Sequence, residues 1–217
     1  MMLEINNISK KYRKGSEEFT ALDNVSFNFD EGDFIVVNGP SGAGKSTLLY
    51  TIGGLIHPDS GDILFKGRNI YNLDAKEKDD YKKKNIGFMF QQFHLMPYLT
   101  VTENIKLACH EISYLADIKD YMDKCSLTDL KNKFPSELSV GEKQRTAFIR
   151  AIISKPDLLL ADEPTGNLDP VNSAVLMSLV EDYHKSGGTV LLVSHDTIAS
   201  QFSNKRVTIE KGRIELF

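Results

Sequence analysis

The sequence lacks the features that would place it in or across a membrane. No stretch approaches the roughly 18 consecutive apolar residues that a membrane-spanning helix needs. The N-terminus, MMLEINNISKKY, also lacks the apolar run of a secretory signal peptide. We therefore expect a cytoplasmic chain whose membrane role, if it has one, comes through a partner protein.

Cysteine is scarce as well, and positive charge is not in excess. The two cysteines, Cys109 and Cys125, form no Cys-x-x-Cys pair, so we expect two free structural thiols and no thiolate metal site. The 26 Lys and Arg residues are outnumbered by 30 Asp and Glu residues, for a net charge of −4. This balance argues against non-specific nucleic-acid binding, which depends on cationic side chains that neutralise phosphates.

What is present is an alternation of apolar runs and helix-like segments. Short, mainly apolar runs at 34–37, 157–162 and 189–194 predict buried strands, and the alternating Val25, Phe27 and Phe29 predict a half-exposed one. Helices are expected after the first two of these runs, and a hairpin is expected over 206–216. The stretch from 102 to 154 is mostly helical in pattern, with breaks near Thr128 and Pro135, and the charge run 74–84 predicts a solvated helix face.

Together these elements predict an α/β fold with a mainly parallel sheet. We expect an α/β core formed by residues 1–92 and 154–217, with an antiparallel β part at its N-terminal end. Residues 93–153 are expected to form a helical subdomain inserted between the two parts of the core.

One motif carries phosphate chemistry directly. The segment GPSGAGKST fits the pattern G-x-x-x-x-G-K-[ST] and lies between an apolar strand and a helix. Backbone N–H groups of such a loop surround a phosphate, and the positive end of the following helix adds to the attraction. Lys45 is expected to reach the β- and γ-phosphates, Ser46 to offer its hydroxyl to Mg²⁺, and Thr47 to add an α-phosphate contact. The nine residues are Gly39, Pro40, Ser41, Gly42, Ala43, Gly44, Lys45, Ser46 and Thr47.

A pair of adjacent carboxylates ends the apolar run DLLLADEP. Asp162 and Glu163 follow four apolar residues directly, which is unlike a solvated acidic loop. At the end of a buried strand two such groups can divide their work. We expect Asp162 to hold Mg²⁺, directly or through water, and Glu163 to activate water near the γ-phosphate.

Five segments, in this order and spacing, resemble one family. GPSGAGKST, FMFQQ, LSVGEKQR, LLLADEPTGNLD and VSHD are similar to the motifs of the ATP-binding cassette (ABC) ATPases, and the resemblance covers nearly the whole chain. It implies a P-loop nucleotide-hydrolase core, ATP and Mg²⁺ as cofactors, and ATP hydrolysis as the activity.

The same resemblance implies roles for residues outside the P-loop. Tyr12 resembles the aromatic that stacks on adenine, although Phe19 is a competing candidate. Gln91 resembles the residue that links the Mg²⁺ site to the helical subdomain, although Gln92 is a competing candidate. Asp169 resembles a residue that couples two sites across an interface, and His195 resembles a switch that contacts the γ-phosphate.

The segment LSVGEKQR resembles the family's signature turn, which completes the ATP site of a second, head-to-tail chain. Ser139 would offer its hydroxyl and Gly141 its backbone N–H to the partner's γ-phosphate, with the helix N-terminus adding positive potential. The usual motif is L-S-G-G-Q, so Val140 and Glu142 are departures. The family's Gln contacts the ribose, so the change to Glu142 puts this contact in question. A carboxylate near the nucleotide would also weaken the ATP-driven pairing of the two chains.

The nearest subgroup is the lipoprotein-releasing and macrolide-exporter type, on the grounds of TGNLD, FMFQQFHLMPYLTVTENI and the spacer RKGSEEFT. It implies a homodimer that drives a permease carried on a separate chain, at the inner face of the cell membrane, with no nucleic-acid partner. Some ATPases of this subgroup instead relay force or an antibiotic signal. The apolar cluster at Phe93–Tyr98 fits either a core or a groove for a short permease helix.

Overall fold

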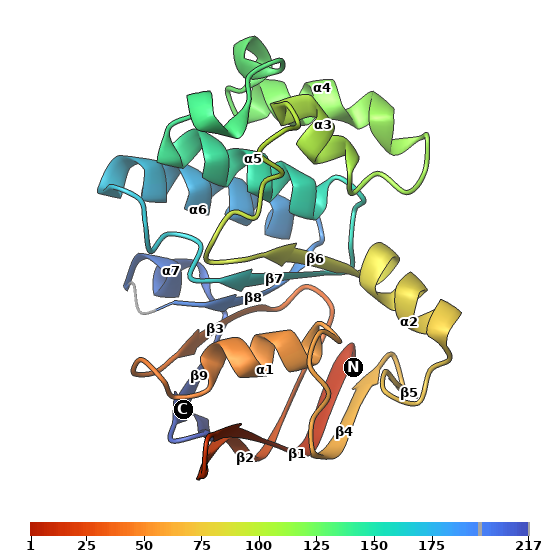
Figure 1. Ribbon diagram of the computed structural model, residues 1–217, viewed down its shortest axis with the longest axis vertical. Helices are drawn as coiled ribbons and strands as arrows, with labels where there is room; N and C mark the ends of the chain where they lie inside the picture. The colour runs from red at the N-terminus through yellow and green to blue at the C-terminus, as the bar shows by residue number, and fades with distance from the viewer. Residues whose placement is uncertain (195–196, 217) are drawn as a thin grey trace.

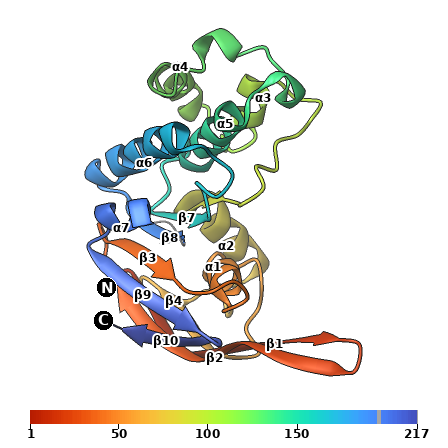
Figure 2. The same cartoon turned by 90° about the vertical axis from the view of Figure 1, so that its left-hand side faces the viewer.

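The chain folds into two sheets with helices between and above them. The structure is a computed structural model that describes residues 1–194 and 197–216. A four-stranded antiparallel sheet lies at one end, a six-stranded sheet lies in the middle, and helices cover the far face of the latter (Figures 1 and 2). None of the helices in the described residues is long and apolar enough to cross a membrane.

The six-stranded sheet has the order β10-β9-β3-β8-β7-β6, and all its neighbouring strands are parallel except the hairpin β9–β10. Its three central strands are almost continuously apolar because helices or a second sheet cover both of their faces. The mainly parallel sheet and the C-terminal hairpin predicted from the sequence are thus confirmed. The strands are β3 (Phe34–Asn38), β6 (Ile86–Met89), β7 (Leu158–Asp162), β8 (Thr189–Val193), β9 (Lys205–Glu210) and β10 (Arg213–Leu216).

The N-terminal antiparallel part is also confirmed. Its sheet has the order β2-β1-β4-β5, with strands β1 (Leu3–Lys14), β2 (Glu17–Phe29), β4 (Ser60–Phe65) and β5 (Arg68–Asn69). In β2 the side chains of Val25, Phe27 and Phe29 are buried and those between them are exposed. The spacer RKGSEEFT contains the turn of the β1–β2 hairpin, whose tip projects from the body (Figure 2).

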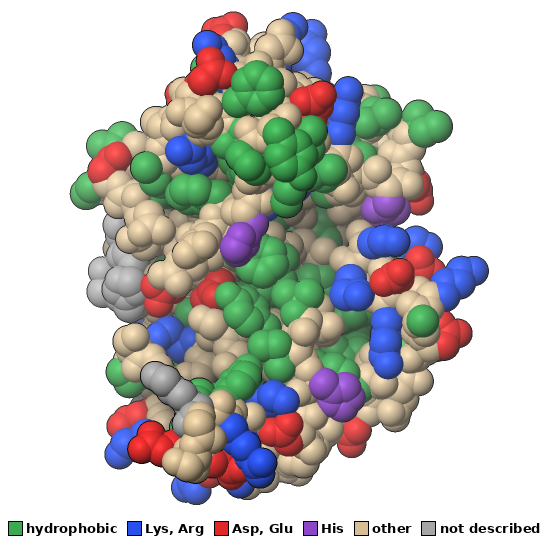
Figure 3. Space-filling view, in the orientation of Figure 1, with side chains coloured by type: hydrophobic (Ala, Val, Ile, Leu, Met, Phe, Trp, Pro, Cys, Tyr) green, Lys and Arg blue, Asp and Glu red, His purple; other side chains and the backbone are tan. Residues whose placement is uncertain are grey.

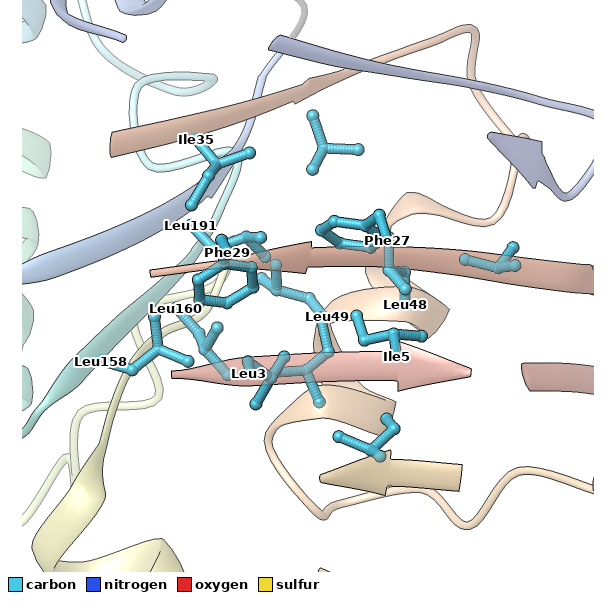
Figure 4. Close-up of a cluster of buried hydrophobic side chains, with 14 of the residues drawn as sticks. Leu3, Ile5, Phe27, Phe29, Ile35, Leu48, Leu49, Leu158, Leu160 and Leu191 are labelled. Atoms are coloured by element: carbon cyan, nitrogen blue, oxygen red, sulfur yellow. The ribbon is translucent and has the colours of Figure 1, made fainter. Parts of the chain in front are cut away.

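Helix α1 (Lys45–Ile52) lies between the two sheets. Leu48, Leu49 and Ile52 are fully buried in a cluster that joins the antiparallel sheet to one face of the six-stranded sheet (Figure 4). Truncation of one such leucine to alanine costs about 2–5 kcal/mol of stability. The helix that follows the P-loop is therefore held from both sides, and so is the loop.

The helices above the six-stranded sheet share one hydrophobic cluster with it. Residues of the 93–153 segment, such as Ile105, Met122 and Phe148, pack in the same cluster as Leu159 and Leu192 of the sheet. The assignment of 93–153 as a separate subdomain stays a prediction. The helices are α2 (Ala75–Asp80), which continues into a π-turn at Tyr81–Asn85, α3 (Val101–Lys106), α4 (Tyr114–Lys124), α5 (Val140–Ile152), α6 (Pro170–Lys185) and α7 (Thr197–Phe202), with 3₁₀ turns at Thr128–Leu130 and Pro135–Glu137.

Candidate functional site

The P-loop follows β3 and ends at α1, as its motif predicts. Gly44 caps α1 in the left-handed region, with φ 105°, and a Cβ on it would clash with the backbone oxygen of Ala21 in β2. This position therefore needs glycine for both its φ and its close contact with the antiparallel sheet. The contact fixes the loop against β2, which belongs to the same sheet as Tyr12.

The lysine of the motif is turned into its own loop. The Lys45 Nζ donates to the carbonyl oxygens of Gly39 at 2.8 Å and Pro40 at 2.9 Å, and the residue is 7% exposed. Two backbone acceptors thus hold the ammonium at the floor of the loop, beside the place where successive N–H groups can meet a phosphate.

Ser46 of α1 and Asp162 at the end of β7 form a pair of oxygen donors for a ligand. The Ser46 hydroxyl donates to Asp162 Oδ1 at 3.0 Å, and the phenol of Tyr50 donates to Asp162 Oδ2 at 2.9 Å. Burial is the main cause that raises the pKa of the Asp162 carboxyl, whereas both hydrogen bonds lower it. Burial, and then the neighbouring Asp162 charge, raises the pKa of Tyr50 to about 12, so the phenol stays a donor.

This pair fits Mg²⁺ by the chemistry of its donors. A hydroxyl and a carboxylate are hard oxygen ligands, and Mg²⁺ on nucleotides is commonly held by one or two such groups with the phosphates and water. No group of three His, Cys, Asp or Glu side chains is arranged for a metal in the part of the chain that the structure describes. By their donor chemistry, Ser46 and Asp162 fit a Mg²⁺ ion that a bound nucleotide would help to hold.

Glu163 lies beside Asp162 but faces a different space. Its backbone has φ 45°, a left-handed conformation that is uncommon for a residue other than glycine. The conformation is held by hydrogen bonds from Glu163 N to Val193 O at 2.9 Å and from Gly166 N to Glu163 O at 3.1 Å. The Gln91 side-chain amide donates to Glu163 Oε2 at 3.4 Å, which links the segment after β6 to this carboxylate.

A cavity of about 410 Å³ joins most of the expected ATP site. Two of its lining residues are the rings of Tyr12 and Phe19, which stack on each other with centroids 5.4 Å apart. Both rings are thus available to a base, and the geometry does not choose between them. The lining residues are Tyr12, Phe19, Ala21, Ser41, Gly42, Gly44, Lys45, Ser46, Thr47, Gln91 and Glu163.

The signature turn begins α5 and lies outside this cavity. Ser139 is the N-cap, where its Oγ accepts from Glu142 N at 3.3 Å while Glu142 Oε2 accepts from Ser139 N at 2.7 Å. This reciprocal pair is a capping box, which satisfies two N–H groups at the helix start. Glu142 thus has a structural role in its own chain that its departure from the family's Gln did not suggest.

Gly141 has a neighbour in its own chain. A Cβ on Gly141 would clash with the side-chain oxygen of Asn172 in α6, so the glycine permits close packing of the two helix starts. Asn172 in turn donates from its backbone N and its side chain to the carboxylate of Asp169, at 2.9 and 2.6 Å. These bonds hold the pKa of Asp169 below its usual range, the backbone bond more than the side-chain bond.

The structure therefore divides the expected site residues into two groups. Tyr12, Gln91, Glu163 and six P-loop residues line one cavity, with Asp162 directly behind Ser46. The other P-loop residues, Gly39, Pro40 and Ala43, do not line it. Ser139, Gly141, Glu142 and Asp169 lie at the starts of α5 and α6, and none of them lines the cavity. His195 lies outside the described residues.

Two residues of these networks were not identified from the sequence. Tyr50 stands in the apolar face of a helix and Asn172 stands in an ordinary first turn, so both resemble packing or capping residues. Their partners, Asp162 and Arg145, are distant in sequence: Arg145 Nη1 donates to Asn172 Oδ1 at 3.1 Å. Only the fold brings these groups together.

Comparison with known proteins agrees with this geometry. Residues 22–166 match the family model of the ABC transporter domain. The chain is 37% identical over 215 residues to the macrolide export ATP-binding/permease protein MacB of Chlorobaculum tepidum, and the match covers 97% of this chain but 33% of MacB. It is 34% identical to the putative hemin import ATP-binding protein HrtA of Staphylococcus haemolyticus, over the full length of both chains.

Solved structures of the ABC transporter cassette MJ0796 have the same fold. One is a dimer, with a TM-score of 0.91 and 34% identity, and the match covers 99% of this chain and 97% of that one. Another, 33% identical, is a dimer in a post-hydrolysis state with ADP and Pi. The chain binds and hydrolyses ATP, and it belongs to the ATP-binding cassette family as an ATPase.

Proposed function

We propose that two copies of this chain close head to tail on two ATP molecules, each bound with Mg²⁺, and drive a permease carried on separate chains. The observation that carries this proposal is the separation of the two phosphate-binding turns. The P-loop lines the cavity, whereas the exposed Ser139 turn lies at the start of another helix. The Ser139 turn can bind phosphate but does not line the cavity of its own chain. It is therefore suited to contact a nucleotide bound by a second chain.

In this proposal each site residue has one task. Lys45 and Thr47 contact the phosphates, Tyr12 stacks on the base, and Ser46 with Asp162 holds Mg²⁺. When bound, Mg²⁺ neutralises charge that develops on the phosphate oxygens. Glu163 takes a proton from the attacking water, since it lines the cavity while Asp162 does not.

The remaining tasks concern communication. Gln91 transmits changes at Glu163 to the helical segment 93–153, because its side-chain amide donates a hydrogen bond to the Glu163 carboxylate. Ser139, Gly141 and Glu142 belong to the contact with the partner's nucleotide, and Asp169 to the interface. His195 is proposed to contact the γ-phosphate.

A crosslinking experiment tests the head-to-tail arrangement. In a Glu163→Gln background with Cys109→Ser and Cys125→Ala, one preparation carries Ser41→Cys and the other carries Ser139→Cys. A short bifunctional maleimide should join the two chains only when ATP is present. Ser113→Cys, exposed near the start of α4, replaces Ser139→Cys as the control. Equal crosslinking with the control, or none that depends on ATP, would contradict the proposal.

The permease contact is proposed at a groove beside Gln91. A cavity of about 420 Å³ lies between β6, the end of α3 and the end of α5. Apolar side chains gather in a band across this face, and Lys or Arg side chains lie toward α2 (Figure 3). The lining residues are Lys82, Lys83, Ile86, Gly87, Phe88, Phe90, His94, Leu107, Ala108, His110, Arg150, Ala151 and Ser154.

The apolar cluster after Gln91 adds to the surface around this groove. Met96 is 36% and Tyr98 72% exposed, which favours the groove over the core interpretation of this segment. Arg150 donates to the carbonyl oxygens of Phe93 and His94, both at 2.7 Å, and so ties α5 to the segment that follows Gln91. A short amphipathic permease helix bound there would hold the chain at the inner face of the membrane.

Export, lipoprotein release and peptide or antibiotic extrusion all fit this arrangement. The alternative is a complex that relays force or an antibiotic signal without transport. Purifying the chain with the permease encoded beside its gene, and assaying ATP-dependent transport in vesicles, separates the two. Permease-stimulated ATP hydrolysis without vectorial movement of any offered substrate would favour the alternative.

A further inference from the structure

Tyr50 makes a contact that the roles proposed above do not use. It lies on α1 and donates its phenol proton to Asp162 Oδ2, while Ser46 donates to Oδ1 of the same carboxylate. Each oxygen of a group that is 1% exposed therefore has its own donor. The two donors face different spaces, because Ser46 lines the nucleotide cavity and Tyr50 does not.

The ring of Tyr50 is fixed by two other aromatic side chains. Its centroid lies 5.6 Å from that of Phe88 and 6.1 Å from that of Phe90, and these two rings stack on each other at 4.2 Å. Both phenylalanines belong to β6 or the residues that follow it. These contacts hold the ring where its phenol oxygen lies 2.9 Å from Oδ2 of Asp162.

We propose that Tyr50 is a positioning residue for the metal site, since its phenol holds Oδ2 of Asp162 and leaves Oδ1 beside the Ser46 hydroxyl at the cavity. The inference rests on the proposed Mg²⁺ site. It gives Tyr50 no direct contact with nucleotide or metal. Hydrogen-bond partners of metal-binding carboxylates fix the orientation of these ligands, and their removal typically lowers metal affinity about 10–100-fold.

The test removes the phenol oxygen and keeps the ring. Wild type, Tyr50→Phe and Tyr81→Phe are compared by the affinity of a fluorescent ADP analogue in excess Mg²⁺ and in EDTA. The ratio of the two affinities measures what the metal adds to binding, independently of turnover. Tyr81 is the matched control, because its buried phenol also touches α1, through the Ile52 carbonyl at 2.8 Å, and does not contact Asp162.

Tyr50→Phe should lower this ratio about tenfold while leaving the affinity in EDTA unchanged. Tyr81→Phe should keep the wild-type ratio. An unchanged ratio in Tyr50→Phe, equal losses with and without metal, an equal fall in the control, or failure to bind in EDTA would overturn the inference. If the wild-type protein bound the ADP analogue equally well in Mg²⁺ and in EDTA, the proposed Mg²⁺ site itself would be contradicted. Failure of the Tyr50 inference is therefore distinguishable from failure of the proposed metal site.

Discussion

At the scale of single residues, the backbone at Glu163 separates two neighbouring carboxylates. A left-handed conformation at a non-glycine residue costs about 1–3 kcal/mol, and it persists where the surroundings hold it in place. Here the bonds to Val193 and Gly166 do so. Asp162 consequently stays buried behind Ser46, while Glu163 reaches the cavity. The sequence predicted the division of work between the two, but a change in φ leaves no trace in the sequence.

The first prediction concerns Glu163→Gln. The amide cannot accept a proton from water, so ATP hydrolysis should fall about 10²–10⁴-fold, the usual contribution of a general base. The fold should be unaffected, because the bonds that hold residue 163 come from its backbone. Steady-state phosphate release and the melting temperature measure both effects. Glu31→Gln, in the exposed turn before β3, is the control, and hydrolysis near the wild-type rate would remove Glu163 as the base.

The second prediction concerns the paired rings. A ring stacked on a base contributes about 1–3 kcal/mol, so Tyr12→Ala should weaken ATP binding about 5–150-fold. Tyr12→Phe should retain wild-type affinity, and GTP should bind because stacking tolerates any base. Fluorescence titration with an ATP analogue measures these affinities. A loss in Phe19→Ala with none in Tyr12→Ala would move the base contact to Phe19, which lines the same cavity.

At the scale of elements, the starts of α5 and α6 form one unit. Gly141 of α5 and Asn172 of α6 are in contact, and Asn172 joins Arg145 to Asp169. In addition, Gln144 of α5 donates to the Pro164 carbonyl at 2.6 Å, next to Glu163. The turn at Ser139 is thus connected within its own chain to the strand end that carries Glu163, the proposed general base.

The third prediction tests that unit in the isolated chain. Gly141→Ala should destabilise the fold by about 1–3 kcal/mol, because the added methyl group meets Asn172. Asn172→Ala should offset much of this loss when the two changes are combined. Denaturant unfolding without nucleotide gives the four free energies of the cycle. Additive losses would mean that the two residues do not interact.

Element prediction from the sequence succeeded where side-chain pattern alone decides the outcome. The apolar runs form β3, β7 and β8, because strands buried on both faces consist almost entirely of apolar residues. The charge run forms α2 and its π-turn, because a solvated helix is rich in charged residues. In β1 the register with β2 shifts three times, and Asn7 has φ 50°. Such irregularities interrupt alternation, so β1 could not be assigned from the sequence, whereas the alternating Val25, Phe27 and Phe29 of β2 could.

At the scale of the whole molecule, the nucleotide cavity forms where separate segments meet. The antiparallel sheet contributes Tyr12 and Phe19, the P-loop contributes Lys45, and the segments after β6 and β7 contribute Gln91 and Glu163. The motifs named most of these residues, and the structure brings them to one cavity, whereas their roles toward a nucleotide stay a prediction. The sequence could not predict the phenol behind Asp162, because that contact depends on how α1 is held between the two sheets.

The fourth prediction concerns the assembled dimer. Lys45→Ala disables the P-loop of the chain that carries it, and Ser139→Phe blocks the turn that would contact the partner's nucleotide. Each homodimer has two broken sites, whereas a mixed dimer has one intact and one doubly broken site. With random pairing and independent sites, mixing should restore about a quarter of the wild-type ATPase rate.

Mixing each variant with wild type at the same total concentration provides the control. No recovery in the mixed preparation, when native mass spectrometry shows that mixed dimers have formed, would contradict shared sites.

The projecting β1–β2 hairpin has a consequence for what this chain can distinguish. The phosphate end of the cavity is rigid, since α1 is packed on both sides, whereas the rings at the other end sit on a strand pair secured near its tip by exposed ion pairs such as Lys11–Glu18. Exposed pairs contribute less than about 1 kcal/mol and weaken with salt. We therefore expect such a site to be more selective for the number of phosphates than for the base. The chain would therefore respond to the energy charge of the cell more sharply than to the identity of the nucleoside that carries it.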